Sequence, residues 1–449
     1  MLFRSCIVTH LRLCLVASCA VLLSAIPAAA QESRPGRPYR GLFGPEGKNA
    51  AQVLSVSGAA GIGYDTDVIA ERRDRVVSVG NVSFLRTDDL FSVFGGGIDY
   101  SDHTNGHDIR ASLSSVARNY SQFATVSSEQ ASTDLTWRVT RRTTLTAYQS
   151  AMYQPWGALI LAPTATDPGF GEAVAPGRLI PVVNGSYKTY SAGGTASEQL
   201  SRRSAVTASY RYDIAKFSGL DGDYRSQIGT LTYTHGITQN LQWRAGYIQA
   251  ESRFRGHDTF YRQRSLDAGL DYSRYLSSSR RTRGGFSTGV TGVEDRNYTR
   301  YMATGSAFIN REIGRTWNAV AVYTRDVAFF ETLRVPYFYD GLTVGINGLI
   351  SRRISLHSSV AGTYGDVSVI TARPAANHFA TATGAAGLIL AISRYAGIAA
   401  DYIVYAYSLD DTSAFWYGLT PSFSRQSVVV TLRAWLPLIE RGRRPDATR

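Results

Sequence analysis

The feature that most constrains this chain is an alternation of apolar and polar residues at every second position. Residues 204–217 (SAVTASYRYDIAKF) show it clearly, because Val206 and Ala208 fall on one parity and Arg211 falls on the other. A period of two is the side-chain period of a β-strand with two unlike faces. Similar segments of about 10–14 residues recur throughout residues 52–436 without an intervening linker. The sequence therefore predicts a single all-β unit.

Short and long connections alternate between these segments. The short ones include 140–143 and 237–240, and the longer ones include 216–223 and 409–418. A chain that crosses a membrane repeatedly has tight turns on one side and longer loops on the other. We therefore predict a transmembrane antiparallel β-barrel of about 18 strands, with 16 as the fallback. Eighteen strands result if residues 76–86 belong to the first outer loop.

Soluble β-architectures fit less well. A secreted propeller or β-solenoid needs repeats of fixed period with recurring turn motifs, which the sequence lacks. A sandwich core does not grow to about 390 residues without dividing into domains. A closed barrel, in contrast, satisfies every backbone polar group and has no exposed strand edge, as a lipid environment requires.

The first thirty residues have the pattern of a secretory signal peptide. Two arginines precede a short apolar stretch, and Ala28 and Ala30 form an A-x-A cleavage site. We predict a signal peptide over 1–30, a flexible periplasmic leader over 31–50, a barrel over 51–437 and a C-terminal tail over 438–449. All three cysteines lie within the predicted signal, so the mature chain would have no disulfides or thiol chemistry.

The formal net charge is +12, and loss of Arg4 and Arg12 with the signal would lower it by two to +10. A basic balance is typical of polyanion partners such as nucleic acid, anionic glycan or lipid phosphate. The charge is spread thinly, and an exported chain without a basic block does not indicate nucleic acid. We expect outer-membrane lipid, the barrel-insertion machinery and an anionic or polar glycan as partners, and the bacterial outer membrane as the location.

The polar parity supplies the candidate pore lining. Side chains on this parity would face a water-filled interior, and they are mainly Arg and Asp; a mixed-charge path with an arginine bias would attract anionic or hydroxylated solutes. The simpler alternative is that these charges only solvate the wall and pair with one another. The predicted pore-lining residues are Arg110, Arg118, Asp134, Arg138, Arg211, Asp213, Arg244, Asp267, Asp271 and Arg433.

Large aromatic residues gather near the ends of the predicted strands. An aromatic girdle is expected at each membrane interface of a barrel, although Tyr and Trp also favour strands in general. The residues expected to form it include Tyr120, Tyr153, Trp156, Tyr187, Tyr212, Tyr275, Tyr301, Tyr323, Tyr364, Tyr407 and Trp435.

The sequence resembles the outer-membrane β-barrel porin families of Gram-negative bacteria, some of which accompany exopolysaccharide systems. The likeness is carried by the segments LSVSGAAGIGYDTDV (54–68), IRASLSSVARNY (109–120) and STDLTWRVTRRTTLTAYQSAMYQP (132–155). It implies an outer-membrane pore, with export of exopolysaccharide as one role. Such barrels usually end at an aromatic residue read by the insertion machinery. Here the segment SVVVTLRAWLPL (427–438) is followed by IERGRRPDATR, and Trp435 is the aromatic residue near the strand end.

Three further features bear on function. Residues 155–186 form the longest predicted loop, with five prolines, and either constrict the barrel mouth or pack on neighbouring loops. Residues 285–289 (GFSTG) match the G-x-S-x-G pattern of hydrolases, but they continue as a strand. His103 and His107 with their flanking aspartates suggest either a metal site or, as we favour, an ordinary turn. We therefore predict no enzyme, cofactor or metal. A plugged or scaffold barrel acting through its outer loops is the alternative to a pore.

Overall fold

The computed structural model describes residues 42–43, 50–66, 88–104, 106–121, 125–155, 186–217, 223–238, 241–254, 259–272, 282–294, 299–330, 335–367, 378–409 and 422–442. The predicted signal peptide with its cleavage site at Ala28 and Ala30, most of the predicted leader and residues 156–185 of the predicted plug lie outside the described residues. Within the described part, no helix is long and apolar enough to cross a membrane.

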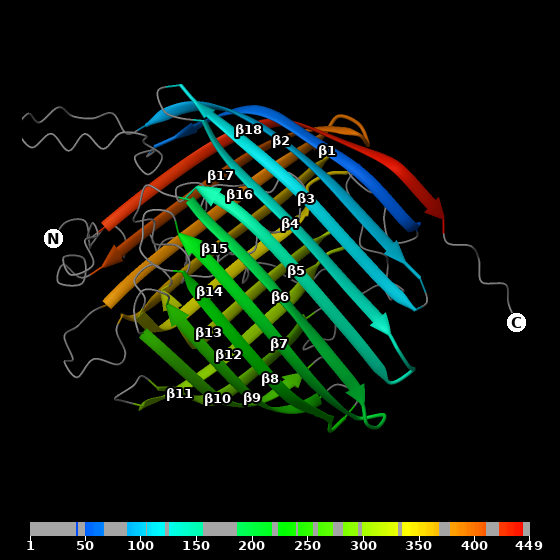
Figure 1. The fold of residues 1–449 in the computed structure, drawn as a ribbon. Coiled ribbons are helices and arrows are strands. Elements are labelled where there is room, and N and C mark those ends of the chain that lie inside the picture. The colour runs from blue at the N-terminus through cyan, green and yellow to red at the C-terminus, as the bar shows by residue number, and fades with distance from the viewer. Residues whose placement is uncertain are drawn as a thin grey trace, which may run out of the picture.

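The described residues form one sheet of eighteen antiparallel strands that closes on itself as a barrel (Figure 1). Each strand pairs with its sequence neighbours, and β1 also pairs with β18, which completes the ring. This confirms the predicted fold class and the strand number of 18. The strands are β1 (Ala50–Asp65), β2 (Asp89–His103), β3 (His107–Tyr120), β4 (Thr125–Arg138), β5 (Thr143–Pro155), β6 (Ser186–Gln199), β7 (Ser204–Phe217), β8 (Tyr224–Gly236), β9 (Leu241–Phe254), β10 (Thr259–Tyr272), β11 (Thr282–Glu294), β12 (Thr299–Ile313), β13 (Trp317–Phe330), β14 (Val335–Leu349), β15 (Ile354–Val367), β16 (His378–Ala391), β17 (Ala396–Leu409) and β18 (Ser422–Gly442).

The two faces of each strand differ as the alternation predicts. In β7 the apolar parity points out of the barrel, and Tyr210 on this face is 52% exposed. Across the β7–β8 pair, Ala208 lies opposite Leu231 and Thr207 lies opposite Thr232, so apolar residues continue the outer face and polar residues continue the inner one. Exposure of the large apolar side chains on this outer face to water would be unfavourable, whereas contact with lipid would be favourable.

The two ends of the barrel differ in their connections. Ala50 of β1 lies opposite Gly442 of β18, so the barrel begins and finishes at the same end, which we call the termini end. Connections at this end span three or four residues, apart from 273–281. The opposite or far end has the long connections 66–88, 156–185 and 410–421, but also four-residue ones after β3, β9, β11 and β13.

Several strands are longer than the sequence indicates. Residues 328–340 read as a long outer loop, yet β13 continues to Phe330 and β14 begins at Val335. The β-branched and aromatic residues of this segment favour paired strand even where the alternation is lost. Similarly, β18 continues to Gly442, five residues beyond the predicted barrel end at 437. A membrane-spanning strand needs only about 9–11 residues, so strands of this length extend beyond the hydrocarbon layer.

The predicted aromatic girdle is only partly correct. Tyr301 and Tyr364 are exposed on the outer face, whereas Tyr120, Tyr407 and Trp435 are buried on the inner one. Nearness to a strand end places an aromatic residue at the right height, but parity decides which face it occupies. Trp156 and Tyr275 lie outside the described residues.

Candidate functional site

The inner face of the barrel carries the predicted pore-lining residues. Their parity is opposite to that of the exposed apolar residues on the same strands. Asp271 belongs to β10, but its side chain lies outside the described ones. The remaining inward-facing residues of the predicted set are Arg110 and Arg118 on β3, Asp134 and Arg138 on β4, Arg211 and Asp213 on β7, Arg244 on β9, Asp267 on β10 and Arg433 on β18.

Three of these residues lie in one row across five adjacent strands, β3 to β7. Arg110 is opposite Asp134, which is opposite Tyr148. Tyr148 is opposite Gly193, which is opposite Arg211. A side chain at Gly193 would collide with the hydroxyl of Tyr148, so glycine leaves the tyrosine room to lie along the wall. Strand register thus brings together charges that are about a hundred residues apart in sequence.

Two close ion pairs lie on this part of the wall. The Arg211 Nε atom donates to Asp213 Oδ2 at 2.7 Å, and the arginine side chain is 40% exposed. The Arg244 Nε atom lies 3.2 Å from Asp267 Oδ2, with both side chains partly exposed. A guanidinium has five N–H donors, and Arg211 makes its pair through Nε. The wall is therefore polar, and its charges are largely paired and in contact with the lumen.

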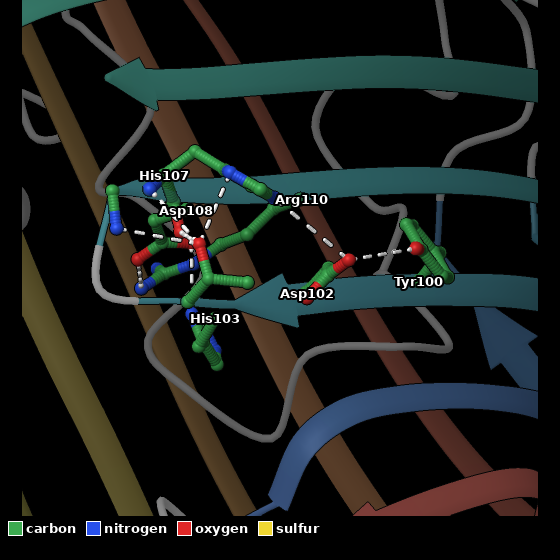
Figure 2. A network of polar contacts seen from close by, with 8 residues as sticks. Tyr100, Asp102, His103, His107, Asp108 and Arg110 are labelled. Carbon is green, nitrogen blue, oxygen red and sulfur yellow. Dashed lines mark hydrogen bonds and ion pairs between the residues drawn. The ribbon is translucent and has the colours of Figure 1, made fainter. Parts of the chain in front are cut away.

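A polar cluster lies where the β2–β3 hairpin reaches the termini end, as Figure 2 shows. His103 Nδ1 lies 2.9 Å from Asp108 Oδ1, and Arg110 donates to the same carboxylate at 3.3 Å. Beside them is a hollow of about 220 Å³. The residues that line it are His103, Thr104, Gly106, His107, Asp108, Thr136 and Arg138. Arg138 of β4 therefore lies next to the β2–β3 turn, at the rim of the barrel interior.

The turn interpretation of residues 102–108 is confirmed. β2 ends at His103 and β3 begins at His107. The Thr104 hydroxyl accepts the N–H groups of Gly106 and His107, the pattern of a side-chain-stabilised turn. Within the described residues, no group of three or more His, Cys, Asp or Glu side chains is arranged to hold a metal ion.

Two predicted pore residues are buried in the wall instead of lining open space. Arg118 is 3% exposed, and its guanidinium lies 5.6 Å from the centre of the Phe91 ring. Arg433 is 7% exposed and donates to Asp401 at 2.5 Å. His357 lies 3.4 Å from the other oxygen of that carboxylate. These side chains hold neighbouring strands together, and we leave them out of the path considered below.

Two inner-face features near the barrel closure are not predicted by the sequence alone. Arg425 of β18 donates to Asp65 of β1 at 2.6 Å, and both side chains are essentially inaccessible. Beside this pair is an apolar cluster of Phe91, Val93, Val116, Tyr120 and Val429, although all five residues are on the inner parity. Because β1 and β18 are at opposite ends of the sequence, only their register shows that Arg425 and Asp65 meet.

The G-x-S-x-G segment lies within a strand, as the sequence indicates. Ser287 is on the inner face of β11, and its hydroxyl is 2.8 Å from that of Ser306 on β12. A hydrolase nucleophile needs a strained turn between a strand and a helix. Ser287 has no such turn.

Comparisons with known proteins add a likeness of shape only. The chain is similar to OprD of Pseudomonas aeruginosa, with 10% identity, a TM-score of 0.40, and coverage of 88% of this chain and 98% of that one. It is similar to OccAB4 of Acinetobacter baumannii, with 12% identity, a TM-score of 0.43, and coverage of 87% and 99%. It is also similar to the siderophore receptor PirA of A. baumannii, with 9% identity, a TM-score of 0.39, and coverage of 85% and 80%. No protein-family model and no curated protein matches the sequence.

Proposed function

We propose that this chain is an outer-membrane pore that passes polar or anionic solutes. The observation that carries the proposal is the inward row on β3–β7, where charged side chains stay partly exposed inside a closed barrel of eighteen strands. Barrels of 16–18 strands leave an aqueous channel, whereas eight-stranded barrels are filled by side chains. The exposed apolar outer face supports residence in a membrane.

The charges on this wall support a modest preference for anions. Arg211 and Arg244 each have an aspartate partner, so their net positive field is reduced. The partly exposed guanidinium of Arg211 still favours hydroxyl, carboxylate and phosphate groups of a passing solute. Small polar solutes and short anionic glycans fit this chemistry. Export of exopolysaccharide is the narrower form of the proposal, and it rests on the sequence resemblance alone.

Single-channel conductance in a planar bilayer tests the pore. The refolded mature chain should give steady open channels, and the reversal potential in a tenfold salt gradient should show weak anion preference. Substitution of three inward arginines, Arg110→Gln, Arg138→Gln and Arg211→Gln, should shift the preference toward cations because positive charge leaves the path. A control variant with Arg225→Gln and Arg253→Gln, two exposed outer-face positions, should keep the selectivity of the unaltered chain.

One observation favours a plugged or gated barrel as the second candidate. Inner-face aromatic residues near the far end are fully covered: Tyr337 and Phe379 meet edge to face at 5.1 Å, and Tyr405 and Tyr407 lie 6.2 Å apart. Part of the inner surface at the far end is therefore not exposed to water. A folded barrel that conducts only after deletion of residues 156–185 would support this candidate and overturn the open pore.

A further inference from the structure

The hairpin turns at the termini end repeat one pattern. Five of them begin with an exposed aliphatic residue and continue with Ser or Thr, and three of these five then carry two arginines: 139–142 (VTRR), 200–203 (LSRR) and 350–353 (ISRR). The turn at 392–395 (ISRY) has one arginine, and Ile237-Thr238 begins another turn in the same way. The recurrence in separate hairpins indicates a shared role for this edge of the barrel.

In the three turns with two arginines, the Ser or Thr hydroxyl accepts hydrogen bonds from backbone N–H groups of the turn. Thr140 Oγ1 accepts the N–H groups of Arg142 and Thr143 at 3.0 and 2.9 Å. Ser201 does the same for the two residues that follow Arg202, and Ser351 for the two that follow Arg352. This is the side-chain-stabilised turn that Ser and Thr favour. Because the turn closes without them, the guanidinium groups are not required for its backbone.

The aliphatic residue places these turns at a membrane boundary. Val139, Leu200, Ile237, Ile350 and Ile392 are between 44% and 57% exposed, in spite of their apolar side chains. Exposure of this kind is unfavourable in water and favourable in hydrocarbon. The hydrocarbon layer therefore extends to the first residue of each turn, and the arginines that follow lie at the height of the lipid headgroups.

Arginines on the outer face differ in their partners. Near the far end, Arg262 pairs with Glu251 at 3.0 Å and Arg325 with Asp340 at 3.6 Å. At the termini end, Arg394 pairs with Glu440 at 3.4 Å, whereas Arg141, Arg142 and Arg203 are exposed and pair with no carboxylate among the described residues. These three turn arginines can therefore take an anionic partner from outside the chain.

We propose that the arginine ring, defined as Arg141, Arg142, Arg202, Arg203, Arg352 and Arg353, binds phosphate groups of anionic phospholipids in the leaflet at the termini end. A guanidinium matches phosphate with two parallel N–H donors, and basic residues next to a membrane surface attract anionic lipid. The proposal shares membrane residence with the proposed function but does not depend on an open lumen.

Native mass spectrometry of the full mature barrel tests lipid binding. The protein is released from vesicles of phosphatidylcholine and phosphatidylglycerol in equal amounts, and the retained lipids are counted. The unaltered chain should retain phosphatidylglycerol in preference. Replacement of all six ring arginines by Gln should lower that preference at least roughly tenfold, since basic residues near a membrane surface attract anionic lipid. Replacement by Lys should restore part of it, because Lys binds phosphate as a point charge.

A matched control removes the same number of exposed cations from the outer face near the far end. Its positions are Lys188, Lys216, Arg225, Arg253, Arg264 and Arg325. This variant should retain phosphatidylglycerol like the unaltered chain. Unchanged retention in the ring variant, or equal loss in the control, would overturn the proposal. A change in gel mobility on heating verifies that each variant is folded.

Two further measurements are made. The first distinguishes free phosphate from lipid phosphate as the ligand, and the second distinguishes failure of the lipid site from failure of the pore. Inorganic phosphate that displaces the lipid at millimolar concentration would mean that the ring recognises phosphate itself, and a lack of displacement would mean that it needs the lipid in place. Conductance is measured in pure phosphatidylcholine. A ring variant that conducts normally but loses phosphatidylglycerol supports the ring, and a non-conducting chain that retains the lipid overturns the pore alone.

Discussion

Two walls of this barrel use the same kinds of inward charge for different purposes. The closure wall, formed by β16–β18, β1, β2 and the far-end half of β3, buries Arg425 and Asp65, which are 1% and 0% exposed. The lumen wall, formed by the termini-end half of β3 and by β4–β10, leaves its charges accessible, and the Arg211 side chain is 40% exposed. Arginine and aspartate on the inner parity therefore do not by themselves indicate a solute path. Their burial separates residues that hold strands together from residues that meet water.

Ion pairs on the two walls differ in burial. On the closure wall, Arg425 and Asp65 belong to different strands and are buried, and so are Arg433 and Asp401. Each pair ties neighbouring strands together beside a covered inner surface. On the lumen wall, Arg211 pairs with Asp213 two positions along the same strand, and Arg244 pairs with Asp267 of the next strand, with both side chains partly exposed. A pair within one strand fixes no register, and exposure weakens both lumen-wall pairs.

The largest effect is expected from breaking the closure pair. Asp65→Asn leaves the Arg425 guanidinium buried beside a neutral partner, and loss of one member of a buried pair costs about 3–5 kcal/mol. We expect the free energy of unfolding in urea, measured on the barrel folded in vesicles, to fall by about that amount. Asp213→Asn, the matched change on the lumen wall, should cost less than about 1 kcal/mol. Equal losses in the two variants would remove the distinction between the walls.

A smaller decrease in the free energy of unfolding is expected at a glycine that leaves space for a buried ion pair. Any side chain at Gly387 would collide with Asp401, the partner of Arg433, and with His357, which contacts the same carboxylate. Gly387→Ala should lower the free energy of unfolding by about 1–3 kcal/mol, as overpacking does. Gly229 of β8 has open space where a side chain would begin, so Gly229→Ala should be neutral or slightly stabilising. Thermal unfolding followed by gel mobility compares the two, and similar midpoints would show that the closure wall adjusts freely.

The alternation of residues predicts the number of strands and, where it is clear, the face of each residue. In β7, for example, it distinguishes Tyr210 on the outer face from Arg211 on the inner one without reference to any other strand. What it cannot supply is register, because register depends on which residues of two distant segments lie opposite each other. The closure pair of Arg425 and Asp65 joins the last strand to the first, and nothing local to either residue indicates the other.

The sequence also does not indicate which inner-face side chains are buried. Arg118 and Arg138 are both on the inward parity of their strands, yet Arg118 is buried near Phe91 and Arg138 is exposed at the rim of the termini end. The difference arises from residues on adjacent strands, including the inward Phe91 and Val93 of β2. Parity assigns a face, and packing across strands decides whether that face is open to water.

The smallest expected effect tests whether the lumen wall meets the solute. Asp213→Asn removes the partner of Arg211 and leaves an uncompensated guanidinium facing the interior. We expect the reversal potential in a tenfold salt gradient to move by a few millivolts toward anion preference, because one charge in a wide lumen changes the local field only slightly. Asp401→Asn makes the same chemical change beside a buried arginine of the closure wall, so it should leave the reversal potential unchanged while it lowers stability. A selectivity change with Asp401→Asn and none with Asp213→Asn would place the conducting path against the closure wall and contradict the assignment made here.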